Sequence, residues 1–296
     1  MLKISFENKP INTQAIAIII NDQLKLDPET LHIDQQFHGI ISKTINDKKI
    51  FNPKYGHSKI LTATNKEGEI HHLILLAIGS ENDATEVKIE ETGGRIHSLA
   101  SHCKANLVGI KLGSKIGSFS PEEVAAQLAS GALLASYRFN KYFTKKTEDE
   151  KFITEEFVID AGDSDKALKL FEEKKALAMG VFFARDCINE VPNILYPESY
   201  AEKIVEKLEP LGIDIDVLGE SQMRHLGMGA LLGVGQGSAN ESKLVVMKYQ
   251  GAGDDSDPIC FVGKGVTFDT GGISIKPAAN MHEMKYDMGG SAAVVG

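Results

Sequence analysis

Four charged side chains in the last part of the sequence have residue types that could carry chemistry. Lys264, Asp269, Lys276 and Asp287 lie within one glycine-rich stretch, where Lys264 and Asp269 flank a predicted turn. A lysine or an aspartate alone is most often a solvated surface residue. Gathered together, carboxylates and amines offer the oxygen and nitrogen lone pairs that replace the water around a divalent cation. The stretch therefore predicts a metal-dependent site.

The elements around these four residues are expected to hold them at one edge of a sheet. The apolar run at 259–262 predicts a buried strand, and the segment 263–272 follows it directly. A helix is expected to begin near the glycine pair 289–290. Binding sites of parallel α/β sheets lie at the carboxyl ends of the strands. The segment after residue 262 is placed at such an end.

Strands and helices alternate along the chain, which is the pattern of βαβ units and a mostly parallel sheet. Apolar runs bounded by turn residues predict strands, and capping residues followed by helical spacing predict helices. The expected strands are at 2–6, 15–20, 59–64, 71–78, 106–112, 152–160, 213–218, 243–249 and 259–262. The expected helices are at about 83–103, 120–138, 166–188, 197–208 and 220–226.

This order predicts the fold class α/β, with two domains joined by a long helix. A small N-terminal α/β domain is expected at 1–163, and a linking helix at 164–190. Residues 191–296 are expected to form the first part of a catalytic α/β domain with a mostly parallel sheet. Within the first domain, Gly93 and Gly94 lie inside a predicted helix. Each costs roughly 1 kcal/mol against alanine, so the pair indicates close packing or a kink.

The composition is that of an ordinary globular protein, with 42% hydrophobic and 25% charged residues in a chain of 296. A net charge of −9 opposes nonspecific binding to nucleic acid, which needs a cationic surface. The apolar runs are too short to span a bilayer and no leader segment is evident, so a cytoplasmic protein without a membrane partner is expected. The three cysteines are widely separated, which favours reduced thiols.

Several familiar motifs begin in this sequence and are not completed. The segment 263–265 resembles the end of a phosphate-binding loop, but Pro258 stands where that loop requires glycine. The pair 282–283 begins like a zincin helix, but Tyr286 replaces the second histidine. The glycines at 233–238 favour a turn before the next strand over a dinucleotide-binding loop. None of these alternatives explains the stretch.

Two further alternatives are weaker still. The run Asp-Thr-Gly at 269–271 has the form found in aspartic proteases, in which two carboxylates share a proton. Those enzymes are largely β proteins, and inhibition by a chelator would separate them from metal chemistry. The aromatic residues between 137 and 143, interleaved with basic ones, could form a stacking platform for nucleic acid. Their helical spacing favours core packing at a helix end.

The residue order at 263–290, GKGVTFDTGGISIKPAANMHEMKYDMGG, resembles the signature of the leucyl (cytosol) aminopeptidase family almost residue for residue. The stretches GALLASYRF at 131–139, ARDCINEVPN at 184–193 and MGALLGVGQGS at 228–238 support the same resemblance. It covers most of the chain from Gly131 onward. Small departures, such as Thr270 where serine is common, remove no ligand.

The resemblance implies a role for each matching residue in a site with two divalent metals. Lys264 is implied to bind one metal as the neutral amine, Asp269 to bridge both metals, and Asp287 to bind the same metal as Lys264. Lys276 is implied to stay charged, to contact the substrate carbonyl oxygen and to stabilise the gem-diolate. Met284 is implied to line the pocket for the first side chain of the peptide, which suits a flexible apolar group.

The implied function is metal-dependent hydrolysis of N-terminal, leucine-like residues from peptides. The implied cofactors are two zinc or manganese ions, with magnesium or cobalt as alternatives, and bicarbonate in the complete protein. The implied partners are peptide substrates and further copies of the chain in a homo-hexamer. A water or hydroxide shared by two metals roughly 3.5 to 4 Å apart attacks the carbonyl in this chemistry.

The sequence does not contain the family's second motif, NTDAEGRL, which supplies the remaining metal carboxylates and an arginine that holds the bicarbonate. The chain is therefore expected to be an N-terminal portion that binds metals poorly and does not catalyse. A DNA-binding or interaction module with vestigial catalysis is the alternative. The acidic balance argues against it, and absence of DNA binding at low salt would remove it.

Overall fold

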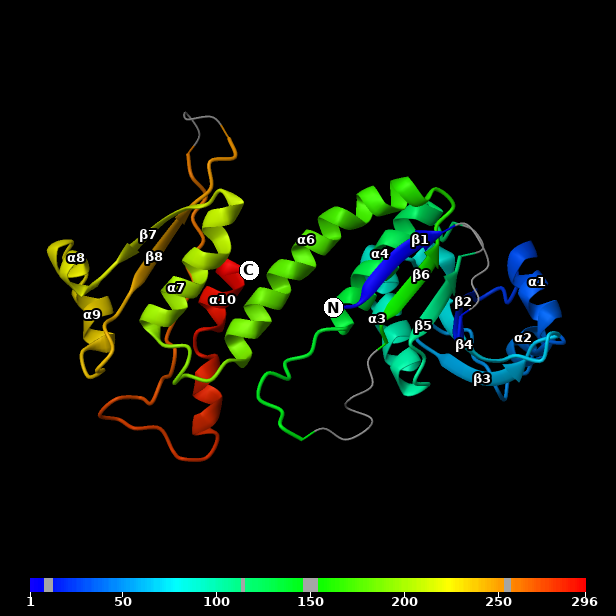
Figure 1. Cartoon of the computed structure of the whole chain (residues 1–296), viewed down its shortest axis with the longest axis horizontal. Coiled ribbons are helices and arrows are strands. Elements are labelled where there is room, and N and C mark those ends of the chain that lie inside the picture. Colours follow the sequence, from blue (N-terminus) through cyan, green and yellow to red (C-terminus); the bar gives the residue numbers. More distant parts are fainter. Residues whose placement is uncertain (8–12, 113–114, 146–153, 253–256) are drawn as a thin grey trace. The chain divides into compact units, whose positions relative to one another are not determined.

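The chain folds into two compact units, Met1–Met179 and Gly180–Gly296. The structure is a computed structural model, and it describes residues 1–7, 13–112, 115–145, 154–252 and 257–296. The boundary between the units falls inside the long helix α6 (Ser164–Asn189), labelled in Figure 1. This helix confirms the one predicted from about residue 166 to 188. The domain limits assigned from the sequence stay a prediction.

The first unit is built on a six-stranded sheet with the order β1-β6-β5-β2-β4-β3 (Figure 1). All its neighbouring strands are parallel except β3, which pairs with β4 in antiparallel register. The strands are β1 (Lys3–Glu7), β2 (Ala15–Asn21), β3 (Ser58–Thr64), β4 (Ile70–Gly79), β5 (Leu107–Lys111) and β6 (Glu156–Asp160). The predicted α/β class with a mostly parallel sheet is confirmed.

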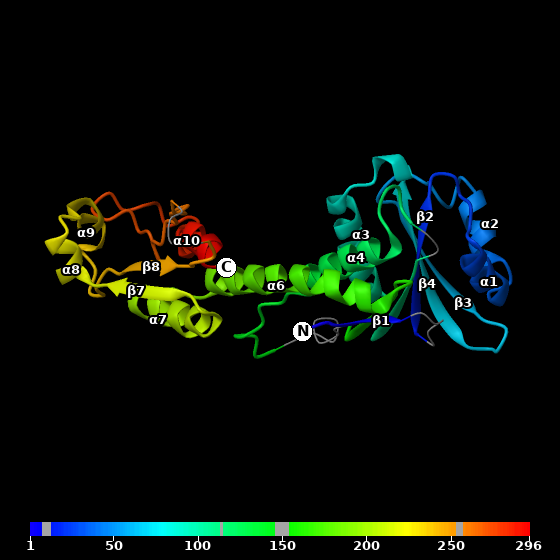
Figure 2. The same ribbon diagram turned by 90° about the horizontal axis from the view of Figure 1, so that it is seen from above.

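Helices cover both faces of this sheet, as Figure 2 shows. One face carries α1 (Pro28–Gln36) and α2 (Ile40–Asn46), and the other carries α3 (Glu86–His102) and α4 (Pro121–Ala135). Strands covered on both faces read as nearly continuous apolar runs, which explains AIAIII in β2 and LILLAI in β4. The core under α1 and α2 contains Ile18, Ile20, Ile33, Phe37, Ile41, Ile45, Phe51, Leu73, Leu75 and Ala77.

Two glycines allow α3 and α4 to approach each other closely. A Cβ atom on Gly93 of α3 would lie 2.0 Å from the backbone oxygen of Leu128 in α4. A Cβ atom on Gly131 of α4 would lie 1.7 Å from the backbone oxygen of Glu90 in α3. Real atoms cannot approach so closely, so each glycine is required by the helix opposite. The close packing predicted at the glycine pair is confirmed for Gly93.

Capping residues explain where these two helices begin. The side chain of Ser120 accepts from Glu123 N at 3.3 Å, and Glu123 Oε2 accepts from Ser120 N at 2.7 Å, which forms a capping box at the start of α4. Helix α3 is capped by Thr85, whose Oγ1 accepts from Lys88 N at 3.3 Å. The helix expected from about residue 83 therefore begins later, because residues 81–83 form a separate 3-10 turn.

The aromatic segment after α4 differs from its prediction. The helix ends at Ala135, three residues before the expected end at Arg138. Tyr142 and Phe143 lie in the following loop and are 45% and 55% exposed, so they are not core residues at a helix end. Spacing at helical intervals had favoured burial, but the backbone there is no longer helical. The predicted strand at 152–160 is shorter, and residues 152–153 lie outside the described ranges.

The second unit is a smaller α/β assembly around a two-stranded sheet. Its strands β7 and β8 pair in antiparallel register, although alternation with helices had suggested parallel pairing. The elements are α7 (Pro197–Leu208), β7 (Asp214–Leu218), α8 (Glu220–His225), α9 (Gly229–Gly235), β8 (Leu244–Lys248) and α10 (Gly289–Val295). Its core contains Phe183, Cys187, Leu195, Tyr200, Ile204, Met288, Ala292 and Val295.

Two stretches of the second unit, one apolar and one rich in glycine, have a structure other than the one predicted. Residues 259–262 are not a strand, and Val262 is 90% exposed. An apolar run forms a buried strand only when neighbours supply hydrogen bonds, and no described strand pairs with this one. The segment expected to turn at 233–238 is partly helical, because α9 extends to Gly235. None of the helices in the described ranges combines the length and hydropathy of a membrane span.

Candidate metal centre

The four charged residues singled out in the sequence meet in the second unit. Lys264 Nζ lies 2.9 Å from Asp287 Oδ2, and Lys276 Nζ lies 2.6 Å from Asp269 Oδ2. The two pairs adjoin, because Asp287 contributes to the pKa of Asp269, and Asp269 contributes to the pKa of Lys264. The stretch 264–287 therefore brings two lysines and two aspartates together in one cluster.

Lys264 is positioned by the first turn of α10. Its backbone oxygen accepts from Ser291 N at 2.8 Å, and the hydroxyls of Ser291 and Tyr200 lie 3.2 Å apart. Gly263 and Gly290 make this approach feasible, since a Cβ atom on Gly263 would lie 2.5 Å from Ser291 Cα. The segment that carries Lys264 is therefore held on the helix end without belonging to a strand.

Asp269 is positioned by the loop that it begins. Its Oδ1 accepts from Gly271 N at 2.9 Å, which closes a short turn from side chain to backbone. Gly271 has φ +89°, a left-handed conformation that side chains disfavour. Farther along, Lys276 N donates to Thr270 O at 2.9 Å and returns the chain beside Asp269. The two consecutive glycines of the motif thus shape the loop.

Lys276 is enclosed by acceptors. Besides Asp269 Oδ2, its Nζ lies 3.2 Å from the backbone oxygen of Asp269 and 3.2 Å from the sulfur of Met284. The side chains of Lys276 and Asp269 are about one-third exposed, 35% and 33% respectively. Met284 lies in the 3-10 helix at Met281–Tyr286, half-buried beside the ammonium group.

One carboxylate oxygen of Asp287, Oδ2, is shielded from solvent and lacks a hydrogen-bond donor within the described part of the chain. The ammonium of Lys264 is 2.9 Å away, so this oxygen takes part in an ion pair. A buried carboxylate oxygen in this condition is the kind of atom that a metal ion could satisfy.

The electrostatics of the cluster describe its state without metal. The adjacent carboxylate of Asp287 raises the pKa of Lys264, so the amine is protonated at neutral pH. The hydrogen bond from Lys276, aided by Gly271 N, lowers the pKa of Asp269 and keeps this carboxylate ionised. Two ammonium groups therefore balance two carboxylates, and a lysine can bind a metal only after it loses its proton.

The side chains in this cluster are of the types that bind a divalent cation, but they are too few to complete its coordination shell. Carboxylate oxygens and an amine nitrogen suit zinc and manganese. Within the described ranges, however, no three histidine, cysteine, aspartate or glutamate side chains are grouped so that they could hold a metal ion. Asp269 and Asp287 with Lys264 thus form part of a coordination shell.

Some residues that build the site gave no chemical signal in the sequence. Tyr200 and Ser291 support α10, and burial raises the pKa of Tyr200 to about 12, so its hydroxyl is neutral. Lys285 Nζ donates to the backbone oxygen of Asn189 at 3.1 Å and ties the 3-10 helix to the end of α6. These contacts join residues about ninety positions apart, which spacing within a motif cannot indicate.

Comparison with known families places both units in one class of protein, the peptidases. The family model described as the cytosol aminopeptidase family, catalytic domain, matches residues 182–296. The model described as the N-terminal domain of the same family matches residues 17–146. The chain belongs to the cytosol aminopeptidase family. The resemblance inferred from the motif at 263–290 is thereby confirmed and extends to the first unit.

Curated relatives agree with this assignment. The chain is 55% identical to a protein named "Probable cytosol aminopeptidase" from Rickettsia bellii (strain RML369-C), with all of this chain and 59% of the relative covered. It is 54% identical to the protein of the same name from Rickettsia massiliae (strain Mtu5), over the same shares. The chain thus spans 59% of the length of these relatives.

Solved structures of low sequence identity share the fold. A mutant of tomato leucine aminopeptidase superposes with a TM-score of 0.81 at 21% identity, over 100% of this chain and 58% of that one. The bottromycin maturation enzyme BotP in complex with Mn superposes with a TM-score of 0.70 at 25% identity, over 96% of this chain and 55% of that one.

Proposed function

We propose that this chain provides the N-terminal unit and one side of the active site of a dinuclear metallo-aminopeptidase. The observation that carries the proposal is the convergence of Lys264, Asp269, Lys276 and Asp287. Membership of the cytosol aminopeptidase family supports it independently. The reaction is hydrolysis of the first peptide bond, with release of an N-terminal, leucine-like residue.

Three residues would hold the metal ions. Lys264 and Asp287 would hold one ion, and Asp269 would offer its carboxylate to both. The solvent-shielded oxygen of Asp287, which forms an ion pair with Lys264, supports this role. BotP, which shares the fold, was solved in complex with Mn, and this favours manganese, with zinc as the second choice for the same donors. When bound, two such ions polarise a carbonyl and lower the pKa of water.

Lys276 acts on the substrate as a fixed positive charge. Its ammonium is paired with Asp269, and in the working site it turns to the oxygen of the scissile carbonyl. Negative charge grows on that oxygen as the carbonyl is attacked, so a positioned cation stabilises the transition state more than the substrate. Met284 beside Lys276 lines the pocket for the first side chain of the peptide.

The residues in this sequence are proposed to be insufficient for turnover by themselves. A dinuclear site needs more carboxylates than the partial set described here. We therefore expect weak metal binding and little hydrolysis from the 296 residues alone, and full activity from a protein of the relatives' length. Assembly as a homo-hexamer, use of bicarbonate and a place in the cytosol belong to the same proposal.

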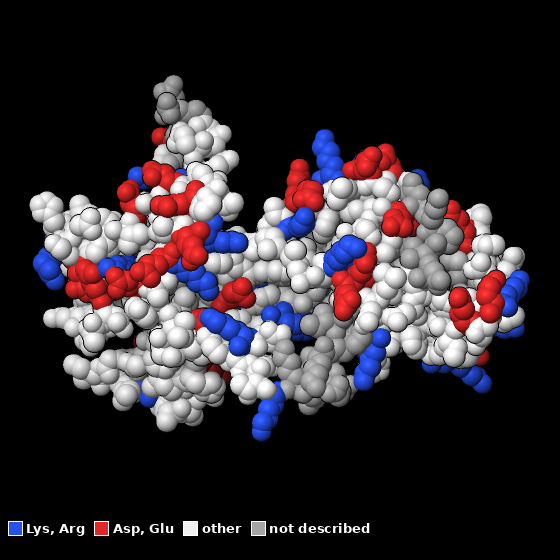
Figure 3. All heavy atoms as spheres, viewed as in Figure 1, with Lys and Arg blue, Asp and Glu red and all other residues white. Residues whose placement is uncertain are grey.

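Nucleic-acid binding receives little support from the charge distribution. On the face in Figure 3, lysine and arginine side chains lie among aspartates and glutamates in each unit. A surface that neutralises phosphates needs an excess of cations, and the net charge is −9.

Hydrolysis of leucine p-nitroanilide by the protein that contains this sequence tests the proposal. Lys276→Met is expected to lower kcat by about 100-fold or more, with a smaller change in KM, because removal of one oxyanion donor costs that much. Asp269→Asn is expected to abolish turnover and reduce the bound metal, measured by atomic emission.

A matched control comes from the same unit. Lys248, which pairs with Asp216 at 2.9 Å on the surface, is replaced by methionine and should leave kcat unchanged. Near-normal activity of Lys276→Met would refute the role of that residue, and near-normal activity of Asp269→Asn would refute the metal mechanism.

A further inference from the structure

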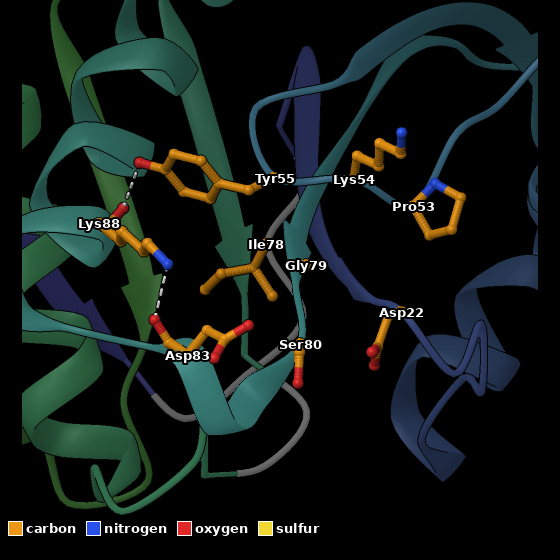
Figure 4. A pocket seen from close by; sticks show the side chains of 9 residues that line it. All are labelled: Asp22, Pro53, Lys54, Tyr55, Ile78, Gly79, Ser80, Asp83 and Lys88. Carbon is orange, nitrogen blue, oxygen red and sulfur yellow. Dashed lines mark hydrogen bonds between the residues drawn. The ribbon is translucent and has the colours of Figure 1, made fainter.

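The first unit contains a hollow at the carboxyl edge of its sheet, outside the proposed metal centre. Its volume is about 300 Å³, and it lies where β2 and β4 end (Figure 4). Polar side chains from three segments surround it, namely Asp22, Lys54, Tyr55, Ser80, Asp83 and Lys88. No feature of the aminopeptidase mechanism uses these residues, since all metal ligands proposed above lie in the second unit.

The hollow lies at a topological switch point. Strands β2 and β4 are parallel neighbours, with Ile20 opposite Ala77. The chain leaves β2 toward α1 on one face and leaves β4 toward α3 on the opposite face (Figure 2). Connections that diverge in this way leave a crevice outside the carboxyl ends of the two strands, which is the general place for ligands in open α/β sheets.

The walls of the hollow are fixed by backbone contacts. Asp22 N donates to Gly79 O at 3.0 Å, which extends the ladder of β2 and β4 beyond their ends. Gly56 N donates to Ala77 O at 2.9 Å and holds the loop before β3 against β4. Gly79 has φ +73°, and a Cβ atom there would lie 3.3 Å from Tyr55 N. The site is therefore preformed.

The polar groups around the hollow differ in their bonding. Lys88 donates to Asp83 O at 2.8 Å and lies 5.5 Å from the ring centre of Tyr55. The hydroxyl of Tyr55 is bound to Glu91 Oε2 at 2.5 Å. The carboxylates of Asp22 and Asp83 and the ammonium of Lys54, in contrast, make no hydrogen bond or ion pair within the described ranges. These three groups are available to a ligand.

The available charges select the chemical class of the ligand. A phosphate or another anion would meet two carboxylates, and a simple cation would meet two lysines. A zwitterion satisfies both, with its carboxylate on Lys54 and its ammonium on Asp22 or Asp83. The volume is at the lower limit for small-molecule pockets, roughly 300 to 1,000 Å³, so the ligand is small.

We propose that this hollow binds a free amino acid or a dipeptide. Asp22 and Asp83 are assigned to the ammonium of this ligand. Lys54, whose side chain points away from both aspartates in Figure 4, turns to meet the ligand's carboxylate, while Ser80 and Tyr55 complete the lining. The inference rests on the first unit alone and does not depend on the proposed aminopeptidase activity.

Calorimetric titration of the 296-residue chain with L-leucine tests the site, with a chelator present to keep metals out of the second unit. Saturable binding with one site is expected. Isovalerate, which lacks the amine, and isopentylamine, which lacks the carboxylate, should bind about tenfold more weakly or not at all, because each leaves one charge unpaired. Inorganic phosphate should not bind.

Variants assign the binding to the hollow. Asp83→Asn and Lys54→Met should each weaken leucine binding by about tenfold or more. Lys59→Met, on the exposed side of β3, is the matched control and should bind as the unaltered chain does. Lys276→Met should also retain full affinity, which separates this site from the proposed active site.

Four outcomes would overturn the proposal. They are no leucine binding at millimolar concentration, equal binding of isovalerate or phosphate, unchanged affinity in both hollow variants, or loss of binding in Lys276→Met. Because Asp83 and Lys54 are exposed and bear free side chains, their variants should keep the circular dichroism spectrum of the unaltered chain.

Discussion

The amine of Lys264 is protonated beside Asp287, and this state must change when a metal binds. Contact with the carboxylate raises the pKa of Lys264, so the proton stays on at neutral pH. A dication at the same carboxylates reverses the preference, because it repels the ammonium and accepts the neutral amine. In the proposed site, metal binding would therefore be coupled to the loss of one proton.

Metal binding should therefore release a proton that comes from Lys264. Titration of the protein with Zn²⁺ in buffers of different ionisation enthalpy measures the number of protons released, and affinity should rise as the pH rises. In Lys264→Met, about one proton fewer should be released. Equal release by the variant and the unaltered protein would show that Lys264 is not a ligand.

A residue of the first unit, His97, is expected to make stability depend on pH. His97 lies in α3, is 2% exposed, and neither of its ring nitrogens has a hydrogen-bond partner within the described residues. Burial lowers the pKa of His97 to about 4, with the nearby charge of Arg138 as a smaller cause. The folded protein therefore favours the neutral ring, whereas the unfolded chain takes up a proton near pH 6.5.

The free energy of unfolding should consequently fall as the pH is lowered from about 6.5 to 4. Below pH 4 the contribution of His97 should change no further. The loss at pH 4 amounts to roughly 3 kcal/mol, since each pKa unit corresponds to about 1.4 kcal/mol. Urea unfolding of the unaltered chain and of His97→Leu at several pH values measures it. If the free energy of unfolding changed equally with pH in both proteins, the pH dependence could not come from His97.

At the scale of elements, the contact between α3 and α4 depends on the absence of a side chain at Gly93 and at Gly131. Gly93→Ala places a carbon 2.0 Å from Leu128 O, so the helices must separate. The free energy of unfolding should fall by about 2 kcal/mol or more, as for other overpacked interiors.

Gly94→Ala is the natural control, because the neighbouring position has more room. Its Cβ atom would lie 3.4 Å from Gly131 O, which the structure can accommodate. This variant should be neutral or gain up to about 1 kcal/mol from helix propensity. Thermal unfolding compares the two, and equal destabilisation would argue against the close contact.

The elements also show which patterns a sequence can predict. The strands β2 and β4 are long apolar runs, and the capping box at Ser120 is local, so both were predictable from neighbouring residues. The run at 259–262 has the same apolar composition as those strands, yet it lacks a pairing neighbour in the described structure. Burial of a strand depends on distant partners, which local composition cannot reveal.

In the candidate metal centre, too, residues within one motif could be predicted, whereas contacts from distant parts of the chain could not. Lys264, Asp269, Lys276 and Asp287 could be selected because their order within one motif is specific. The support from Tyr200 comes from a different part of the chain and was not predictable. The hollow at β2 and β4 also escaped prediction, because its lining residues come from separate turns.

At the scale of the whole molecule, the second unit carries several large apolar side chains that are exposed. Large side chains along one stretch are exposed, namely Ile259, Phe261, Val262, Ile273 and Ile275. We infer that these side chains form an apolar patch, and large patches of this kind mark surfaces that other protein normally covers. We expect the 296-residue chain to bind a hydrophobic dye and to self-associate as its concentration rises.

Replacement of Phe261 and Val262 by serine should reduce dye fluorescence and self-association. Leu211 provides the control, since it is 68% exposed at a separate position of the same unit and its replacement by serine should change little. Dye binding and analytical ultracentrifugation measure both effects. A monomer without dye binding at high concentration would contradict the expectation.

The paired charges of the metal centre have a consequence for the order of events during biosynthesis. Lys264 and Lys276 act as internal counterions, so the carboxylates of Asp287 and Asp269 are neutralised before any ion is present. A newly made chain can therefore bring these residues together without waiting for a cofactor. Under the proposed function, metal would enter a protein that is already folded and only the Lys264 ammonium would lose its proton, so cellular metal supply would control activity and not folding.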